Sequence, residues 1–165
     1  MINYVTKNRD IVDAIALCSP ELLQSLVIDQ GYDINSPLST ESIYSFNRST
    51  CGNDFVPAVE EIVALDTSFC SPFAYPLHLA ILAIYRSAAS YSSSKREQAF
   101  KTIQILIDNG ADCNLGCNGL LILCVDKYKW ALFTRKLPIH LAMTLKKYGG
   151  ADKQMDDVIT LLQKQ

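Results

Sequence analysis

The sequence has no long hydrophobic run and no large excess of charge of either sign. Its longest apolar segments, residues 77–85 and 119–125, are much shorter than the roughly 18 uninterrupted apolar residues of a membrane-spanning helix. The 15 lysines and arginines and the 17 aspartates and glutamates leave a formal net charge of −2. Such a chain has no overall field that would hold nucleic acid or an anionic membrane. We therefore expect no membrane span and no nucleic-acid partner.

Residues for cofactor and metal chemistry are also scarce. The chain has seven glycines and two histidines, and it contains neither of the glycine-rich phosphate-binding motifs, Gly-x-Gly-x-x-Gly and Gly-x4-Gly-Lys-Ser/Thr. Cys113, Cys117 and Cys124 do not have the Cys-x2-Cys spacing of a zinc knuckle. The sequence predicts no cofactor and no metal site.

The amino-terminal residues and the cysteines bear on the compartment. The first ten residues contain no apolar stretch like that of a secretory signal. The six cysteines are scattered along the sequence, and a chain of this size needs no disulfide to be stable. We expect free thiols in a reducing compartment and a cytoplasmic protein.

What the chain does have is apolar surface. Of its 165 residues, 49% are hydrophobic and 19% are charged. It can therefore bury enough apolar area to offset the entropy cost of folding. The length suits one domain, which we expect to span residues 1–165.

Two short phrases occur twice in this sequence. Gly-Tyr-Asp-Ile-Asn at residues 31–35 returns as Gly-Ala-Asp-Cys-Asn at 110–114, and both copies follow a helical pattern. Pro-Leu-His-Leu-Ala-Ile at 76–81 returns as Pro-Ile-His-Leu-Ala-Met at 138–143, and each proline suits the first position of a helix. Internal repetition therefore organises the fold, and we expect two helices to end in the same turn chemistry.

These phrases resemble the ankyrin repeat family. The Pro-x-His-Leu-Ala phrases match the opening of that family's first helix, residues 103–107 and 158–162 match its second helix, and Gly-Ala-Asp-x-Asn matches its hairpin. The resemblance implies an all-α fold, an ankyrin-repeat-like helix-turn-helix solenoid with inserted loops or helices. It places the repeats near residues 8–35, 75–114 and 137–165, and the insertions near 36–73, 87–94 and 115–134.

The three insertions differ in composition. Residues 87–94 are rich in serine and predict a flexible bridge. Within the first insertion, residues 57–65 suit an amphipathic helix. Residues 119–133 are too apolar for a mobile loop. We expect them to fold onto the stack as a buried helix or strand.

The resemblance also implies a function, which is to bind a partner protein through the concave face and the hairpin surface. It implies that His78 and His140 are structural, so we expect no enzyme. The partner-facing candidates combine the family's variable positions with apolar and basic neighbours in the last insertion. They are Leu82, Ala83, Tyr85, Trp130, Phe133, Thr134, Arg135, Lys136, Thr144 and Leu145. An alternative is that the insertions cover the apolar members of this set inside the fold.

Two other functions stay open at this point. One is an enzyme whose site is built from the insertions, with a cysteine nucleophile or with carboxylates such as Glu60 and Glu61. The other is a bacterial effector that is translocated into a host cell by a non-Sec route and acts on a host protein. Degenerate eukaryotic-type repeats and the lack of a Sec-type signal motivate that second alternative.

Overall fold

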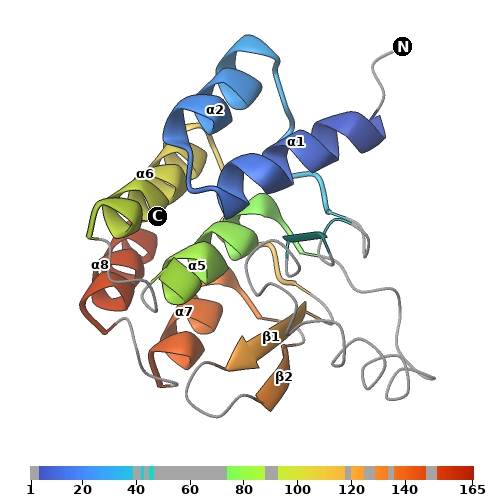
Figure 1. The fold of residues 1–165 in the computed structure, drawn as a ribbon. Coiled ribbons are helices and arrows are strands. Elements are labelled where there is room, and N and C mark those ends of the chain that lie inside the picture. The colour runs from blue at the N-terminus through green and yellow to red at the C-terminus, as the bar shows by residue number, and fades with distance from the viewer. Residues whose placement is uncertain are drawn as a thin grey trace, which may run out of the picture.

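The part of the chain that the structure describes forms three pairs of helices and one β-hairpin (Figure 1). In the computed structural model, the described residues are 4–38, 42, 45–46, 74–87, 93–117, 120–124, 129–133, 136–147 and 152–165. The predicted helical character is confirmed. A description as all-α is incomplete, because part of the last insertion forms two strands.

Each repeat predicted from the sequence contributes one helix pair. The first pair is α1 (Tyr4–Ala16) with α2 (Pro20–Gln24), which continues into the π-helical turn η1 (Ser25–Asp29). The second pair is α5 (Pro76–Ser87) with α6 (Ser93–Asp108). The third pair is α7 (Pro138–Lys147) with α8 (Asp152–Gln163).

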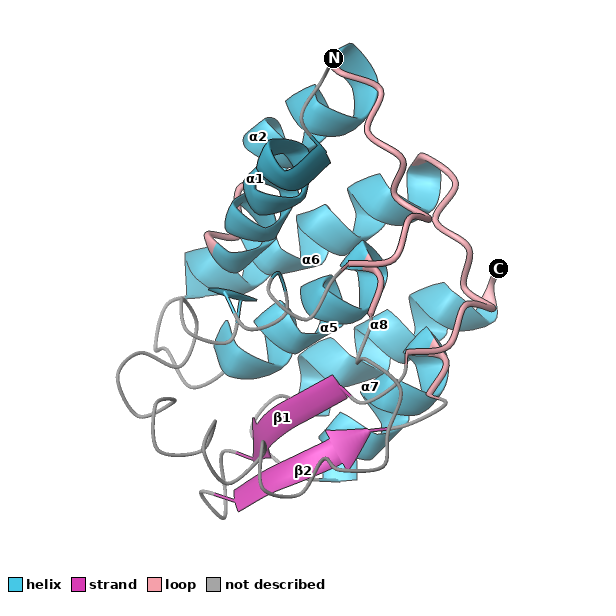
Figure 2. Cartoon of the chain, turned by 90° about the vertical axis from the view of Figure 1, so that its right-hand side faces the viewer, coloured by secondary structure: helices cyan, strands magenta, loops and turns pink. Residues whose placement is uncertain are grey.

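The three pairs stack in order as two layers of helices (Figure 2). The first helices form one layer, because α1 packs on α5 and α5 packs on α7. The second helices form the other layer, because α2 packs on α6 and α6 packs on α8. The second pair therefore lies between the other two.

Proline and serine set the starts of several helices. Pro76 and Pro138 are the first residues of α5 and α7, as the repeated phrase predicts. The missing N–H of a proline costs nothing there, because the first N–H groups of a helix have no partner within it. Ser19 caps α2, with its hydroxyl accepting a hydrogen bond from the N–H of Leu22 at 3.4 Å.

The two copies of the Gly-x-Asp-x-Asn phrase adopt the same turn, as expected. Gly31 has φ +63° and Gly110 has φ +92°, left-handed values at which a side chain would be strained. Two residues later, each aspartate carboxylate accepts a hydrogen bond from the N–H of the asparagine that follows. The distances are 3.0 Å for Asp33 and Asn35 and 2.8 Å for Asp112 and Asn114.

The first of these turns is bonded to the second. The side-chain amide of Asn35 donates to the carbonyl of Gly110 at 3.0 Å, and its oxygen accepts from the N–H of Asp112 at 2.8 Å. The equivalent residue of the second turn, Asn114, is exposed and has no such side-chain bond to any described residue. Asn35 therefore joins the first repeat to the second.

Two of the insertions leave and rejoin the stack at equivalent points. The third residue after Asn35, Leu38, donates its N–H to the carbonyl of Ala74 at 2.7 Å. The third residue after Asn114, Cys117, donates its N–H to the carbonyl of Lys136 at 3.0 Å. Ala74 and Lys136 each stand two residues before the proline that opens the next helix.

The last insertion extends the second of these bridges into a β-hairpin. Strand β1 (Leu120–Cys124) pairs antiparallel with β2 (Lys129–Phe133), from Leu120 opposite Phe133 to Cys124 opposite Lys129. The bridge between Cys117 and Lys136 lies in the same register. Of the two structures expected for residues 119–133, the strand is therefore the one observed.

Other predictions for the insertions lie outside the described residues. These are the helix at residues 57–65 and most of the serine-rich bridge between α5 and α6. Of the first insertion, Leu38 and Phe46 belong to the hydrophobic core and are completely buried.

Asn35 allows a direct test of the bond between repeats. Substitution of Asn35 by Ala removes both hydrogen bonds to the second turn, and we expect it to lower the free energy of unfolding by about 1 kcal/mol, because the site is exposed. The matched control is Asn114→Ala, which removes the equivalent side chain where it bonds no described residue. Equilibrium urea unfolding measures both. Equal losses in the two variants would contradict the role given to Asn35.

Candidate functional site

Helix α5 does not present a binding strip. Every residue from 76 to 85 is buried, because α5 is packed by α1, α6 and α7. Leu82, Ala83 and Tyr85 are only 0%, 3% and 1% exposed. The prediction that these three side chains face a partner is therefore wrong. They are covered inside the fold, as the alternative expected, but by the helices α1, α6 and α7 rather than by the insertions.

Helix α7 has one buried face and one open face. Leu141, Ala142 and Leu145 are completely buried, so the prediction that Leu145 faces a partner is also wrong. Thr144, in contrast, is half-buried and lies on the open face, together with His140, Met143 and Lys147. These four residues follow the spacing by which a helix places side chains on one side.

The remaining candidates belong to the last insertion or follow it directly. Lys136 is half-buried and lies next to α7. Trp130 and Phe133 stand in β2, opposite Leu123 and Leu120. Thr134 and Arg135 lie outside the described residues. The structure thus brings Lys136 and Thr144 together and separates them from Leu82, Ala83, Tyr85 and Leu145.

His78 holds the second repeat to the third. Its Nδ1 accepts a hydrogen bond from the N–H of Tyr75 at 3.3 Å, which leaves the ring hydrogen on Nε2 to be donated to the carbonyl of Lys136 at 3.0 Å. The side chain is completely buried. Burial lowers the pKa of His78 to about 4, although the bond to the Lys136 carbonyl acts in the opposite direction. A neutral histidine is therefore a structural part of the stack.

His140 occupies the same position in its repeat and has a different environment. It is exposed, and its ring makes no hydrogen bond to a described residue. Its carbonyl accepts the hydroxyl of Thr144 at 2.7 Å. The ring of His78 joins two repeats, whereas the ring of His140 is free to contact solvent or a ligand.

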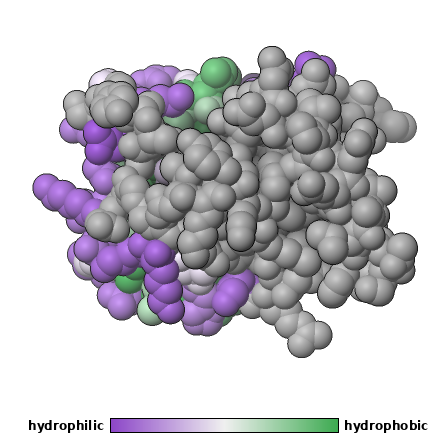
Figure 3. Space-filling model, turned by 60° about the horizontal axis from the view of Figure 1, so that its bottom comes forward, coloured by the Kyte–Doolittle hydropathy of each residue, from purple (hydrophilic) through white to green (hydrophobic). Residues whose placement is uncertain are grey.

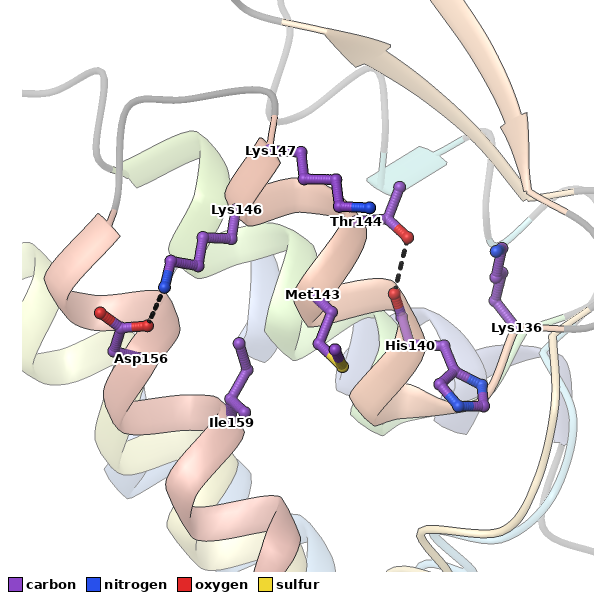
Figure 4. Close-up of a pocket in the computed structure, with 8 residues that line it drawn as sticks. All are labelled: Lys136, His140, Met143, Thr144, Lys146, Lys147, Asp156 and Ile159. Atoms are coloured by element: carbon purple, nitrogen blue, oxygen red, sulfur yellow. Dashed lines mark hydrogen bonds and ion pairs between the residues drawn. The ribbon is translucent and has the colours of Figure 1, made fainter.

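An open groove of about 640 Å³ lies over this face of α7 and the neighbouring face of α8 (Figure 4). Its apolar part is formed by Met143, which is 49% exposed, and the half-buried Ile159. Its polar lining consists of Lys136, His140, Thr144, Lys146, Lys147 and Asp156. Figure 3, which brings the α7 end of the stack forward, shows mainly hydrophilic side chains on the coloured part of that face.

The groove is more basic than the chain as a whole. Its described lining residues include three lysines and one aspartate, whereas the chain has a net charge of −2. Asp156 forms an ion pair with Lys146 (Figure 4). Lys136 and Lys147 have no ion pair with any residue that the structure describes. Two cationic side chains are therefore left to interact with a ligand.

Most of the groove was not predicted from the sequence. Met143, Lys146, Lys147, Asp156 and Ile159 were not among the candidates, and His140 was assigned a structural role only. A signal for the α7 residues was present, because Leu141, Ala142 and Leu145 have the spacing of a core face and Met143 and Lys147 fall on the opposite one. The two residues of α8 required the packing of α7 against α8 to be known.

The cysteines that the structure describes lack the features of a nucleophile. Cys18 and Cys117 are buried and Cys113 is half-buried, and all three are free thiols. Burial raises the pKa of each of these thiols, whereas a nucleophilic cysteine needs a lowered pKa. The enzyme alternative therefore depends on Cys51, Cys70 or Cys124, or on carboxylates such as Glu60 and Glu61, whose side chains lie outside the described part of the structure.

Two further findings concern the described part of the chain only. It contains no cluster of three or more histidine, cysteine, aspartate or glutamate side chains that would hold a metal ion. It also contains no helix with the length and apolar character needed to cross a membrane.

Comparison with known proteins does not identify a function for the chain, so the function must be inferred from these residues. No family model matches the chain, and neither a curated protein nor a solved structure matches it.

The environment of His78 predicts a loss of stability in acid. The group binds a proton near pH 6.5 in the unfolded chain and near pH 4 in the folded chain. Between these values the unfolded state binds more protons, so the free energy of unfolding falls as the pH is lowered. We expect this group to contribute a loss of about 2 kcal/mol between about pH 7.5 and about pH 5.

Urea unfolding at both pH values measures this effect. The His78→Gln variant should lose the pH dependence in this range, whatever its stability at neutral pH. The control variant, His140→Gln, should keep it, because His140 is exposed. A wild-type protein whose stability did not change between the two pH values would contradict the buried, neutral state of His78.

The thiols give a second prediction. In the native protein, Cys18 and Cys117 should react with a thiol reagent at least about tenfold more slowly than in denaturant, because both are buried. Labelling at neutral pH followed by mass mapping of each site measures the rates. Faster reaction of either thiol in the native state would revive a cysteine-based activity among the described residues.

Proposed function

We propose that this chain is a protein-interaction module of the ankyrin type and that it binds its partner at the α7 end of the stack. The support from the sequence is the pair of repeated phrases. The support from the structure is three stacked helix pairs, in which a side chain of one repeat bonds the backbone of the next. Stacks of this kind have long surfaces that suit protein partners.

The observation that carries the proposal is the difference between His78 and His140. In the second repeat, the face that begins with His78 is covered and bonded to the following repeat. In the third repeat, the same face is open, and it is lined by Met143, His140 and lysines. A surface built to receive a neighbouring repeat is well suited to receive another protein, because its apolar and hydrogen-bonding groups are already in place.

The compartment in the proposal is the cytoplasm. The three described cysteines that are free thiols fit a reducing environment. The proposal is also compatible with delivery into a host cell, because the protein would then act in the cytoplasm of that cell.

Affinity capture with quantitative mass spectrometry tests the proposal. The bait is the full chain, compared with Met143→Glu, which places a charge in the apolar part of the groove. The matched control is Ile28→Glu, since Ile28 is equally apolar and 54% exposed but lies in η1 of the first helix pair. We expect a partner to be lost at least about tenfold with Met143→Glu and retained with Ile28→Glu, since a charge buried against a partner is costly.

Circular dichroism and thermal unfolding of both variants must first match the wild type. A partner that is retained by Met143→Glu and lost with Ile28→Glu would place the interaction at the opposite end of the stack and contradict the proposed surface. If no protein exceeds background with any bait, the proposed function is wrong for the cell extract in which the partner was sought.

A further inference from the structure

We propose that the groove between α7 and α8 binds an acidic segment of a partner protein that also carries one apolar side chain. This inference rests on the proposed function and specifies the chemistry of the partner. The charged residues around the groove and the apolar residues within it support this inference.

The apolar part of the groove lies between two helices. Met143 comes from the open face of α7 and Ile159 from α8, and Figure 4 shows both side chains in the space between these helices. Met143 is 49% exposed although it is surrounded by the other lining residues. A flexible thioether beside a branched aliphatic side chain accepts an apolar group of varied shape. This position suits a leucine, isoleucine, methionine or phenylalanine of the partner.

The charges decide what stands beside that apolar group. On the α8 side, Asp156 already neutralises Lys146. On the other side, Lys136 and Lys147 have no described acidic partner, and Thr144 and His140 lie between them (Figure 4). The groove therefore has two cationic groups to be matched, and carboxylates near the apolar residue in the bound segment would match them.

An acidic peptide fits these residues better than nucleic acid does. A single strand of nucleic acid is held by stacking of its bases on aromatic side chains, along with cationic groups. Among the lining residues that the structure describes, His140 is the only aromatic one and none is an arginine. The apolar side chains of Met143 and Ile159 have no counterpart on a phosphate backbone.

The experiment uses the full chain and a synthetic, fluorescein-labelled peptide of glutamates interrupted by a single leucine. Three other probes are matched to it: one with serine in place of leucine, one with lysines in place of glutamates, and a single-stranded oligothymidylate. Fluorescence anisotropy measures binding at low salt and at about 0.3 M NaCl. Exposed charge pairs are weakened by salt, so affinity for the acidic peptide should fall with salt concentration.

The variants separate local from overall charge. Lys136→Glu with Lys147→Glu reverses the two groove lysines. Lys101→Glu with Lys164→Glu makes the same change of net charge at two exposed positions that do not line the groove. We expect the first double variant to bind the acidic peptide at least tenfold more weakly and the second to bind it within about twofold of the wild type. Met143→Ser should weaken binding about fivefold and remove the preference for leucine over serine.

Several outcomes would overturn the inference. These are equal weakening by the two double variants, tighter binding of the lysine peptide, and oligothymidylate binding that exceeds that of the acidic peptide and depends on Lys136 and Lys147. If the reversed double variant fails to fold, the neutral change Lys147→Gln replaces it, with an expected loss of about threefold.

Failure of this inference can be told from failure of the proposed function. Capture of a partner that depends on Met143, together with no binding of the acidic peptide, would overturn the acidic segment and leave the interaction module standing. Groove-dependent binding of the acidic peptide without any captured partner would support the chemistry of the groove and contradict the proposed function.

Discussion

The stack depends on hydrogen bonds that side chains of one repeat make to the backbone of the next. Turns between helices contain N–H and C=O groups that no helix can satisfy, and such groups are costly if they are buried without partners. The buried His78 satisfies the carbonyl of Lys136, and Asn35 satisfies two groups of the second turn at an exposed site. Since both nitrogen atoms of His78 are engaged, only the neutral ring with hydrogen on Nε2 fits this position.

Because each repeat is bonded to its neighbour, position in the stack decides what a residue does. The middle helix α5 is packed on all sides and its repeated phrase is entirely core. The same phrase in α7 has one side in the core and the other side open. The two similar phrases therefore lie in different environments. The open face of α7 forms part of the groove to which both proposals refer.

The fold was easier to predict than the site. The prolines at 76 and 138 and the glycines at 31 and 110 mark helix starts and turns through local backbone chemistry, which does not depend on the rest of the chain. The candidates Leu82, Ala83, Tyr85 and Leu145 were taken from positions that face partners in the resembling family, and they failed because packing against neighbouring helices covers them.

The residues of the groove illustrate what local patterns can and cannot give. The helical period of α7 separates Met143 from Leu141 and Leu145, so its open side was accessible to prediction. The positions of Ile159 and Asp156 beside α7 could not be predicted, because they depend on the tertiary packing of α8 against α7. The strands of residues 119–133 were one of two expected structures, since a short apolar run does not distinguish strand from helix.

The two bridges that close the insertions have a consequence for how this protein changes over time. Leu38 with Ala74 and Cys117 with Lys136 each join the ends of an insertion by a backbone bond, and a backbone bond does not require a particular side chain. Lengthening a closed loop adds only a slowly growing entropy cost. Except for core residues such as Phe46, the segments between the bridges can therefore diverge in length and composition while the helix pairs keep their alignment, so that one scaffold can acquire new surfaces without being rebuilt.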